Sequence, residues 1–202
     1  MLLKIFFFLF FSVLLQAQTA DEIIKKVQNK FSEIKTIKAD FNQTIFANKV
    51  SKPYKLAGKF YFMKKDNFKI ELPSRKIISD GKTTWNYDEK QNKVIISDFD
   101  EENIGFSLNN IIYGYPAKCK LTLVNKKVNG YVIKAVPINS ELNFKEAVLF
   151  INKNFVLTEI EITDYNNMKY SFKLFSIVIN PTLNKNIFHF SPSNTVEVID
   201  LR

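Results

Sequence analysis

The sequence predicts a mainly β domain of the α+β class, built as a strongly curled antiparallel sheet or half-barrel with short helices across its mouth. Two observations lead to this prediction. Many segments alternate apolar and polar residues with a period of two, the pattern of half-buried strands. Two other segments, 20–34 and 103–113, are apolar and helical in character. Because a sheet with one apolar face must curl or be covered, these helices are its natural covers, and the covered sheet encloses an apolar cavity.

The first helix is predicted to begin at a capping box. Thr19 stands at the cap and Glu22 follows three residues later, so each side chain can satisfy a backbone N–H of the other residue. Ile23, Val27 and Phe31 then recur at helical spacing. The segment 20–34 is therefore predicted to be an amphipathic helix with lysines on its other face.

From residue 37 onward the period changes to two. Asp80-Gly81 predicts a hairpin between 76–78 and 85–87, and Asn129-Gly130 predicts another turn. About ten strands are predicted, most of them joined to the next strand in the chain. The segments with this alternation are 37–47, 54–63, 68–72, 76–78, 85–87, 94–96, 121–123, 131–135, 147–151, 156–162, 170–174, 188–190 and 196–199. No linker or internal repeat divides them, so residues 18–202 are predicted to form one domain.

Residues 98–118 interrupt the strands. An acidic cluster at 98–102 comes first, and an apolar run then ends at Gly114-Tyr115-Pro116. This run is more apolar than a surface loop should be. It is predicted to be a short helix or helical loop that covers the sheet.

The N-terminus has the pattern of a secretory signal peptide. Lys4 is followed by an apolar stretch at 5–15, and Ala17 is the small residue at the expected cleavage site. The stretch is shorter than the ~20 residues that a membrane-spanning helix needs, although an uncleaved anchor is the alternative. Cys119 is the only cysteine, so an N-terminus released near Ala17 would carry no thiol for lipid attachment. A freely diffusing periplasmic protein is predicted.

The positive charge favours anionic partners. The 202-residue chain has 29 basic and 20 acidic side chains, and removal of Lys4 with the signal leaves a net charge of +8. Nucleic acid, an anionic membrane face and an acidic protein patch all fit this charge. Only Arg75 and Arg202 are arginines, and nucleic-acid recognition relies on arginine. No nucleic-acid partner is therefore expected.

The sequence shows no convincing catalytic constellation. His189 is the only histidine and stands between two phenylalanines, whereas a zinc site needs several His or Cys ligands. There is no glycine-rich phosphate loop and no Gly-x-Ser-x-Gly motif. A carboxylate pair such as Asp98 with Asp100 lies in a polar loop, and a glycosidase-like pair stays open. No enzymatic activity, cofactor or metal is predicted.

The aromatic content allows two interpretations. Twenty Phe and eight Tyr are present, many of them on one face of the alternating strands. They could form an ordinary β core. They could also line a cavity for acyl chains, where burial contributes about 0.8 kcal/mol per CH₂. Periodicity does not separate the two.

Five segments resemble the bacterial outer-membrane lipoprotein carrier (LolA-like) family. They are the helix-to-strand segment 31–43, the Gly-x-aromatic segment 58–70, the hairpin 79–88, the late hairpin 162–172 and the closing segment 188–192, which reads Phe-His-Phe-Ser-Pro. The hairpin at 79–88 is the most specific. The resemblance runs from about residue 20 to the end. It implies an incomplete antiparallel β-barrel, lidded by helices, that holds the acyl chains of a lipoprotein.

The resemblance also implies a lid latch. In the family, a basic residue after the Gly-x-aromatic strand helps to hold the lid and to switch between closed and open states. That position falls on Lys65, with Lys64 beside it. The family usually has Arg followed by Pro, whereas this chain has Lys65-Asp66, and Lys lacks the planar fork of Arg.

The resemblance and the aromatic pattern together predict a monomeric periplasmic chaperone that carries lipoproteins from the inner to the outer membrane. Its expected partners are acylated lipoproteins, an inner-membrane lipoprotein-releasing transporter and an outer-membrane receptor. The residues expected to contact acyl chains are Phe41, Phe60, Phe62, Phe68, Ile70, Trp85 and Tyr87, with Ile104, Phe106, Ile111 and Ile112 as the lid. A lipid- or glycolipid-binding sensor or carrier module on the same fold is the alternative, and a secreted hydrolase is a third class.

Overall fold

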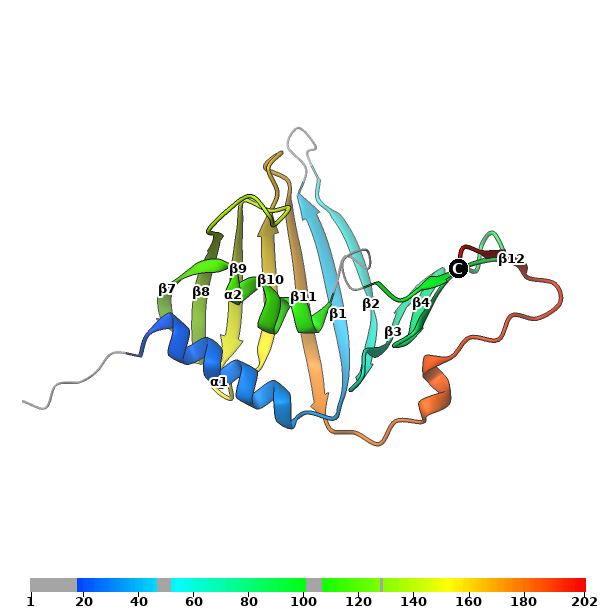
Figure 1. Ribbon diagram of the computed structural model, residues 1–202, viewed down its shortest axis with the longest axis horizontal. Coiled ribbons are helices and arrows are strands. Elements are labelled where there is room, and N and C mark those ends of the chain that lie inside the picture. Colours follow the sequence, from blue (N-terminus) through cyan, green and yellow to red (C-terminus); the bar gives the residue numbers. More distant parts are fainter. Residues whose placement is uncertain (1–17, 47–51, 101–106, 128) are drawn as a thin grey trace, which may run out of the picture.

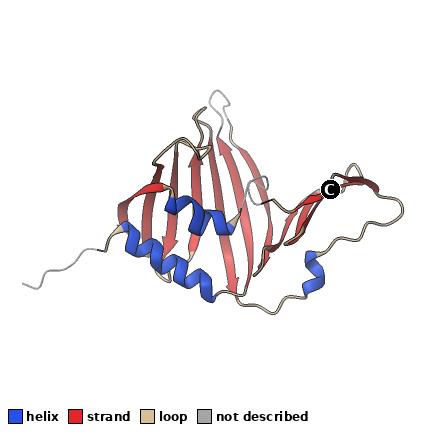
Figure 2. Cartoon of the chain, in the orientation of Figure 1, coloured by secondary structure: helices blue, strands red, loops and turns tan. Residues whose placement is uncertain are grey.

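The computed structural model describes residues 18–46, 52–100, 107–127 and 129–202 of the chain. One curled sheet dominates them, and α1 (Ala20–Glu33), η1 (Asn110–Gly114) and α2 (Tyr115–Ala117) lie on the same side of this sheet (Figures 1 and 2). We call that side the helix-side face and the opposite one the far-side face. Among the described residues, no helix has the length and apolar character needed to cross a bilayer.

The strands of the described chain number twelve and form one sheet, in the order β12-β6-β5-β4-β3-β2-β1-β11-β10-β9-β8-β7. Their bounds are β1 (Thr36–Phe46), β2 (Tyr54–Met63), β3 (Asn67–Leu72), β4 (Arg75–Asp80), β5 (Thr83–Asp88), β6 (Lys93–Asp98), β7 (Cys119–Lys127), β8 (Gly130–Pro137), β9 (Glu146–Asn152), β10 (Leu157–Thr163), β11 (Lys169–Ile179) and β12 (Glu197–Asp200). Strands β7 and β12 are the two edges, so the barrel is not closed. The predicted fold class is confirmed.

Three details differ from the sequence-based expectation. Strand β12 pairs with β6 in parallel, because the C-terminal segment crosses back along the sheet. The segment 188–190 is not a strand: Phe188 ends the 3₁₀ helix η2 (Lys185–Phe188). The second helical segment runs from 108 to 117 among the described residues, later than the predicted 103–113. The alternating residues at 188–190 suggested a strand. The same pattern also suits an irregular segment whose rings pack onto the face of a sheet.

The curl has a local cause at the centre of the sheet. The pairing of β1 with β11 shifts register between Lys38 and Asp40, and Ser176 on the opposite strand adopts a positive φ of 51°. This is a β-bulge, which bends the strand and increases its twist. The pairs β9–β10 and β7–β8 also shift register once each. The bulges let the sheet wrap toward the helices.

Helix α1 forms as the sequence predicts. Thr19 accepts a hydrogen bond from the Glu22 backbone N–H, and the Glu22 carboxylate accepts one from the Thr19 N–H, both at 3.2 Å. Ile23, Val27 and Phe31 are buried against the helix-side face. Burying side chains of this size contributes about 1.5–3 kcal/mol each, which holds the helix on the sheet.

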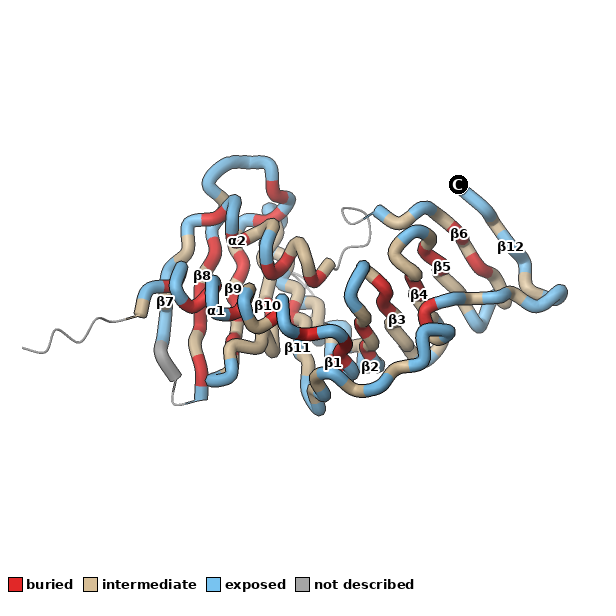
Figure 3. Tube along the Cα trace, turned by 60° about the horizontal axis from the view of Figure 1, so that its bottom comes forward, coloured by how far each residue is buried: buried red, intermediate tan, exposed pale blue. Residues whose placement is uncertain are grey.

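Two separate apolar clusters stabilise the sheet, one on each face. Buried residues recur along strands in both halves of the sheet (Figure 3). The helix-side cluster joins α1, η1 and the strands from β7 to β3, and it includes Phe41, Phe62 and Ile112. The far-side cluster is smaller, and the C-terminal segment packs on it. Its buried members are Ile78, Trp85, Val94 and Ile96, with Tyr87, Phe190 and Val196 packed against them.

Candidate acyl-binding site

The lid of the helix-side face is the helical segment 108–117. Ile111 and Ile112 are buried in the helix-side cluster, as expected for lid residues, whereas Ile104 and Phe106 lie outside the described residues. Pro116 has no N–H to donate to the carbonyl of Ile112, four residues earlier in the chain. That carbonyl instead accepts a hydrogen bond from Gln28 Nε2 at 3.0 Å, which ties the lid to α1.

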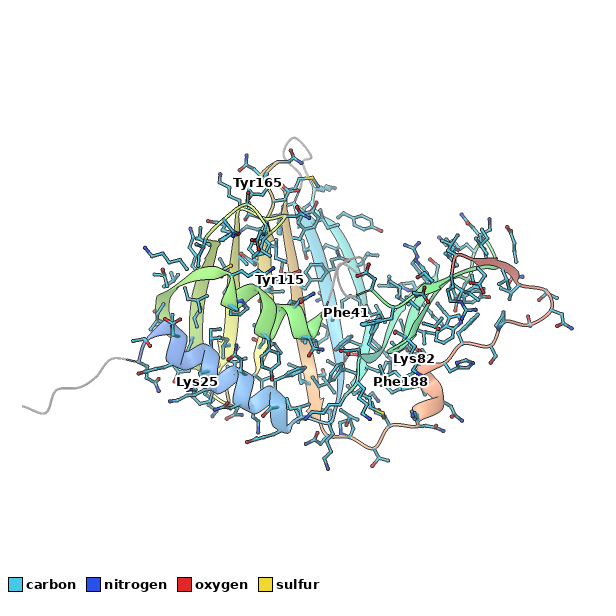
Figure 4. All side chains as sticks on the ribbon, in the orientation of Figure 1. Lys25, Phe41, Lys82, Tyr115, Tyr165 and Phe188 are labelled. Atoms are coloured by element: carbon cyan, nitrogen blue, oxygen red, sulfur yellow. The ribbon has the colours of Figure 1, made fainter. Side chains whose placement is uncertain are left out.

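A second contact joins the lid and α1. Tyr113 donates its hydroxyl hydrogen to the backbone carbonyl of Gln28 at 3.1 Å, and its ring lies 6.1 Å from that of Phe31. The two helical covers therefore form one unit across the helix-side face. In Figure 4, Tyr115 marks this unit in front of the sheet.

The lid is also tied to the turn between β2 and β3. Asn109 Nδ2 donates to Asp66 Oδ1 at 2.5 Å. Burial raises the pKa of the Asp66 carboxyl group above its usual range, and the hydrogen bond from Asn109 partly opposes this shift. Sequence patterns did not predict this pair. Its signal was Asp66 itself, which stands where the resembled family has Pro.

The turn around Asp66 explains that departure. Lys65 and Asp66 have positive φ values of 69° and 58°. Pro cannot adopt such a φ because its ring locks the angle near −65°, whereas Asp tolerates the left-handed region. The buried Asn67 side chain donates to the carbonyls of Lys64 and Lys65 at 3.0 and 3.1 Å and fixes the turn. The turn thus aims the Asp66 carboxylate at the lid.

The two lysines of the proposed latch differ in their contacts. The ammonium of Lys64 donates to the carbonyl of Ser32 near the end of α1. Lys65 contributes its backbone carbonyl to the turn, and its side chain is exposed. The geometry therefore favours Lys64 over Lys65 as a contact to the helical cover.

Register shows which predicted lining residues share a face. Residues paired directly across adjacent antiparallel strands point to the same side. Phe41 pairs with Gly58, Phe60 with Ile70, and Phe62 with Phe68. The five residues that lie together on the helix-side face are Phe41, Phe60, Phe62, Phe68 and Ile70.

Trp85 and Tyr87 lie on the other side of the sheet. Lys69 pairs with Ile78, and Ile78 pairs with Trp85, so Trp85 faces away from Phe68. The Trp85 ring contacts His189 at 4.8 Å between centroids, edge to face, and Tyr87 packs on Phe190 at the same distance. The structure therefore does not place these two residues in the same cavity as the other five. The pairing register across β3 to β5, which periodicity does not give, decides this.

The helix-side face becomes polar toward β5 and β6. Phe68 pairs with Ser79, Ser79 with Thr84 and Thr84 with Ser97, so hydroxyl side chains continue the row that aromatic rings begin. Within the described part of the chain, Thr84 Oγ1 and the neighbouring Asn86 Oδ1 are buried without a hydrogen-bond partner. The neighbouring row on the same face, Ile77, Asn86 and Ile95, is mostly apolar, so the polar groups form one row and not a wholly polar region.

Little free space remains beside the aromatic residues of the helix-side face. One cavity of about 20 Å³ lies between Phe62, Phe68 and Leu108, and another of about 30 Å³ lies beneath α1, lined by Phe31 and Leu174. Ligand pockets commonly hold roughly 300–1,000 Å³. An acyl chain that lies along the aromatic residues of β1, β2 and β3 therefore requires displacement of the lid or of α1.

The remaining reactive groups belong to the core or the surface. Cys119 is buried in the helix-side cluster, and burial raises the pKa of its thiol, which disfavours the thiolate. His189 packs against Trp85. The described residues contain no group of three His, Cys, Asp or Glu side chains that could hold a metal ion.

The family profile of the "Outer membrane lipoprotein carrier protein LolA" matches residues 32–191. The chain belongs to the outer membrane lipoprotein carrier family. An outer-membrane lipoprotein carrier protein of Nitrosomonas europaea is 26% identical over 203 residues, covering 97% of this chain and 98% of the relative. One of Histophilus somni is 25% identical and covers 89% and 88%. Membership in this carrier family supports lipoprotein binding and is consistent with a periplasmic location.

Solved structures of proteins with low sequence identity to this chain share its fold. An uncharacterized conserved protein from Thermus thermophilus superposes with a TM-score of 0.60 at 15% identity, covering 90% of this chain and 98% of that one. Lipoprotein LppX of Mycobacterium tuberculosis superposes with a TM-score of 0.52 at 8% identity, covering 80% and 95%. At these identities the likeness concerns the fold alone, and it extends the carrier family's curled sheet to distant sequences.

Proposed function

We propose that this protein carries lipid-modified proteins through the periplasm, from the inner membrane to the outer membrane, and performs no covalent chemistry. The observation that carries the proposal is the closed aromatic face beneath a lid that few polar contacts hold. The family assignment supports the same class of cargo. Residues 1–17 would act as a signal peptide cleaved near Ala17, releasing a diffusing carrier.

The magnitudes favour a lid that an acyl chain can displace. The hydrogen bonds from Gln28, Tyr113 and Asn109 contribute about 1 kcal/mol each, somewhat more where Asp66 is ionised. Each buried CH₂ of a ligand contributes about 0.8 kcal/mol. A chain of a dozen methylenes thus outweighs these polar contacts, and it replaces the apolar contacts that Ile111 and Ile112 lose.

The acyl chains would lie along Phe41, Phe60, Phe62, Phe68 and Ile70, between the sheet and the displaced lid. The cargo's polar linkage and first peptide groups would lie toward Thr84 and Asn86, where the face becomes polar. An inner-membrane transporter would load the carrier, and an outer-membrane acceptor would unload it.

Two neighbouring residues of β11 allow a matched test. Leu174 pairs with Phe41 and lines the cavity beneath α1, whereas Phe175 is exposed on the far-side face. We expect tagged protein recovered from a periplasm to carry acylated proteins, detected by mass spectrometry with an acyl-specific probe. Leu174→Gln should lose this cargo and Phe175→Gln should keep it, because only the first places an amide in the acyl path.

The control is the circular dichroism spectrum of each variant, which should match that of the unmodified chain. Consistent absence of acylated cargo from correctly folded, unmodified protein would contradict the proposal. Equal cargo in both variants would contradict the assigned path.

A further inference from the structure

One edge of the sheet gathers loop tips. Strands β1, β10 and β8 run in the same direction. A single antiparallel strand separates each from the next: β11 lies between β1 and β10, and β9 lies between β10 and β8. The C-terminal ends of β1, β10 and β8 therefore lie along one edge, which we call the loop edge. It is at the top of Figure 1, whereas α1 lies along the opposite edge.

Large apolar side chains are exposed at this loop edge. Phe46 at the end of β1 is 45% exposed, Tyr54 at the start of β2 is 60% exposed, and Tyr165 in the β10–β11 turn is 58% exposed. Ile138, just after β8, is 72% exposed. At the opposite edge, the described turns 64–66, 153–156 and 180–184 expose no large apolar side chain to this degree, but Val178 near the end of β11 is 49% exposed. What distinguishes the loop edge is that its exposed apolar side chains are mostly aromatic. Such a concentration marks an interaction surface.

The tip that presents Tyr165 is ordered by its own hydrogen bonds. Asp164 Oδ1 accepts from the backbone N–H groups of Asn166 and Met168, both at 2.8 Å. Tyr165, labelled in Figure 4, stays largely exposed while its hydroxyl donates to the backbone carbonyl of Leu142 in the β8–β9 loop at 3.5 Å. Phe46 pairs with Lys169 at the base of the same turn, so the end of β1 and the β10–β11 turn are neighbours.

Lysines surround these aromatic side chains. Lys52 and Lys55 flank Tyr54 on exposed positions, and Lys145, also exposed, donates to Asn167 Oδ1 in the β10–β11 turn at 3.3 Å. Lys169 at this edge is paired with Glu161 at 3.0 Å. Tyrosine and lysine side by side are typical of protein surfaces at a membrane–water interface, and lysine is attracted to anionic lipids.

The loop edge adjoins an opening of the helix-side face. A cavity of about 340 Å³ lies between the lid and the β8–β9 loop, and Tyr115, Leu142, Phe144 and Ile162 are among its lining residues. A flat partner seated on the loop edge would therefore face this opening.

We propose that the loop edge docks on the surface of an anionic phospholipid bilayer, with its exposed aromatic side chains in the headgroup region and its lysines against the anionic headgroups. Apolar side chains exposed at separate points along one edge suit a fluid bilayer better than a pocketed protein partner. The proposal goes beyond carriage of cargo: it concerns the cargo-free protein and stands on the surface alone.

The test uses flotation of purified protein with vesicles. We expect binding to phosphatidylcholine vesicles with about 30% phosphatidylglycerol, and binding at least about tenfold weaker to phosphatidylcholine alone, because lysines contribute to the affinity. The triple variant Phe46→Ser, Tyr54→Ser, Tyr165→Ser should lose about tenfold or more in affinity for the anionic vesicles. A triple of other exposed apolar residues, Phe175→Ser, Val198→Ser and Leu201→Ser, should bind as the unmodified chain does.

A second measurement remains informative if the triple variant folds poorly. Tyr165→Trp should show a blue-shifted fluorescence component when anionic vesicles are added, whereas Phe175→Trp should not. Leu174→Gln should still float, which separates docking from acyl binding. The proposal would be overturned if both triple variants lost affinity for anionic vesicles equally, or if the unmodified protein bound neutral and anionic vesicles equally. It would also be overturned if the loop-edge triple variant still floated with vesicles but lost cargo loading in cells. That last result would assign the loop edge to a protein partner.

Discussion

The two faces of this sheet bury aromatic residues in different ways. On the helix-side face, Phe62 and Phe68 lie under helical covers held by apolar packing and by a few polar contacts, such as that between Asn109 and Asp66. On the far-side face, Trp85 and Tyr87 lie under the chain's own C-terminal segment, which β12 extends into the sheet. The first cover pairs with no strand of the sheet, whereas the second contributes a paired strand to it. Aromatic burial alone therefore does not mark a binding face.

The largest expected effect comes from truncating one buried aromatic side chain on each face of the sheet. Phe62→Ala and Trp85→Ala should each lower the free energy of unfolding by about 3–5 kcal/mol, since both remove a buried aromatic ring. Only Phe62→Ala should also weaken the binding of a fluorescent fatty acid to the folded protein. Urea denaturation gives the folded fraction against which binding is corrected. Equal loss of corrected binding in both variants would remove the distinction between the faces.

A smaller effect is expected where Phe41 lies over Gly58 on the helix-side face. A Cβ at Gly58 would lie 2.3 Å from the carbonyl oxygen of Glu71 and 2.7 Å from the Phe41 ring. Gly58→Ala should therefore cost about 1–3 kcal/mol of stability, the usual range for overpacking. Ala57→Ser, on the exposed opposite face, should change the stability by less than about 0.5 kcal/mol. A neutral Gly58→Ala in thermal unfolding would show that the ring is not held there.

The pH dependence of the folding stability tests the contact between Asp66 and the lid. Burial raises the pKa of this carboxyl above the ordinary 3.8, so the folded protein holds the proton more tightly than the unfolded chain. The contribution of this group to stability is fully present below pH 3.8 and is lost as the pH rises through the raised folded pKa.

Asp66→Asn removes this titration, and its neutral amide can still bond to Asn109. The stability of the variant relative to the unmodified chain should therefore increase with pH across this window and then level off. Urea midpoints measured from acidic to neutral pH provide the check. Parallel curves for the two proteins would show that Asp66 does not titrate differently in the folded state.

The smallest expected difference lies between the two lysines of the proposed latch. Lys64→Ala should lower stability by about 0.5–1.5 kcal/mol, because it removes the ammonium that donates to Ser32 at the end of α1. Lys65→Ala should stay within about 0.5 kcal/mol, since its contribution to the turn comes from the backbone carbonyl. If Lys65→Ala alone accelerated fatty-acid uptake in a stopped-flow measurement, the latch would be at Lys65.

The local elements could be predicted from the sequence because their signals are local. The capping box at Thr19 and the Asp80-Gly81 hairpin each depend on a few neighbouring residues, and both form as predicted. The curled, open sheet also followed from alternation together with two apolar helices.

The rest depended on contacts between distant segments. Alternation divides each strand into two faces but does not say which face of β5 the helices cover, so Trp85 was grouped with Phe68. The bond between Asp66 and Asn109 joins residues 43 positions apart, and the parallel pairing of β12 with β6 joins segments even further apart. Neither leaves a local pattern.

The most direct test of acyl binding on the helix-side face is photocrosslinking with a diazirine-bearing fatty acid, followed by peptide mapping of the adducts. We expect adducts on β2, β3, β11 and the lid segment 108–117, and their loss in Leu174→Gln but not in Phe175→Gln. Adducts confined to β5, β6 or the C-terminal segment, with the protein folded, would contradict the assignment and place the ligand on the far-side face.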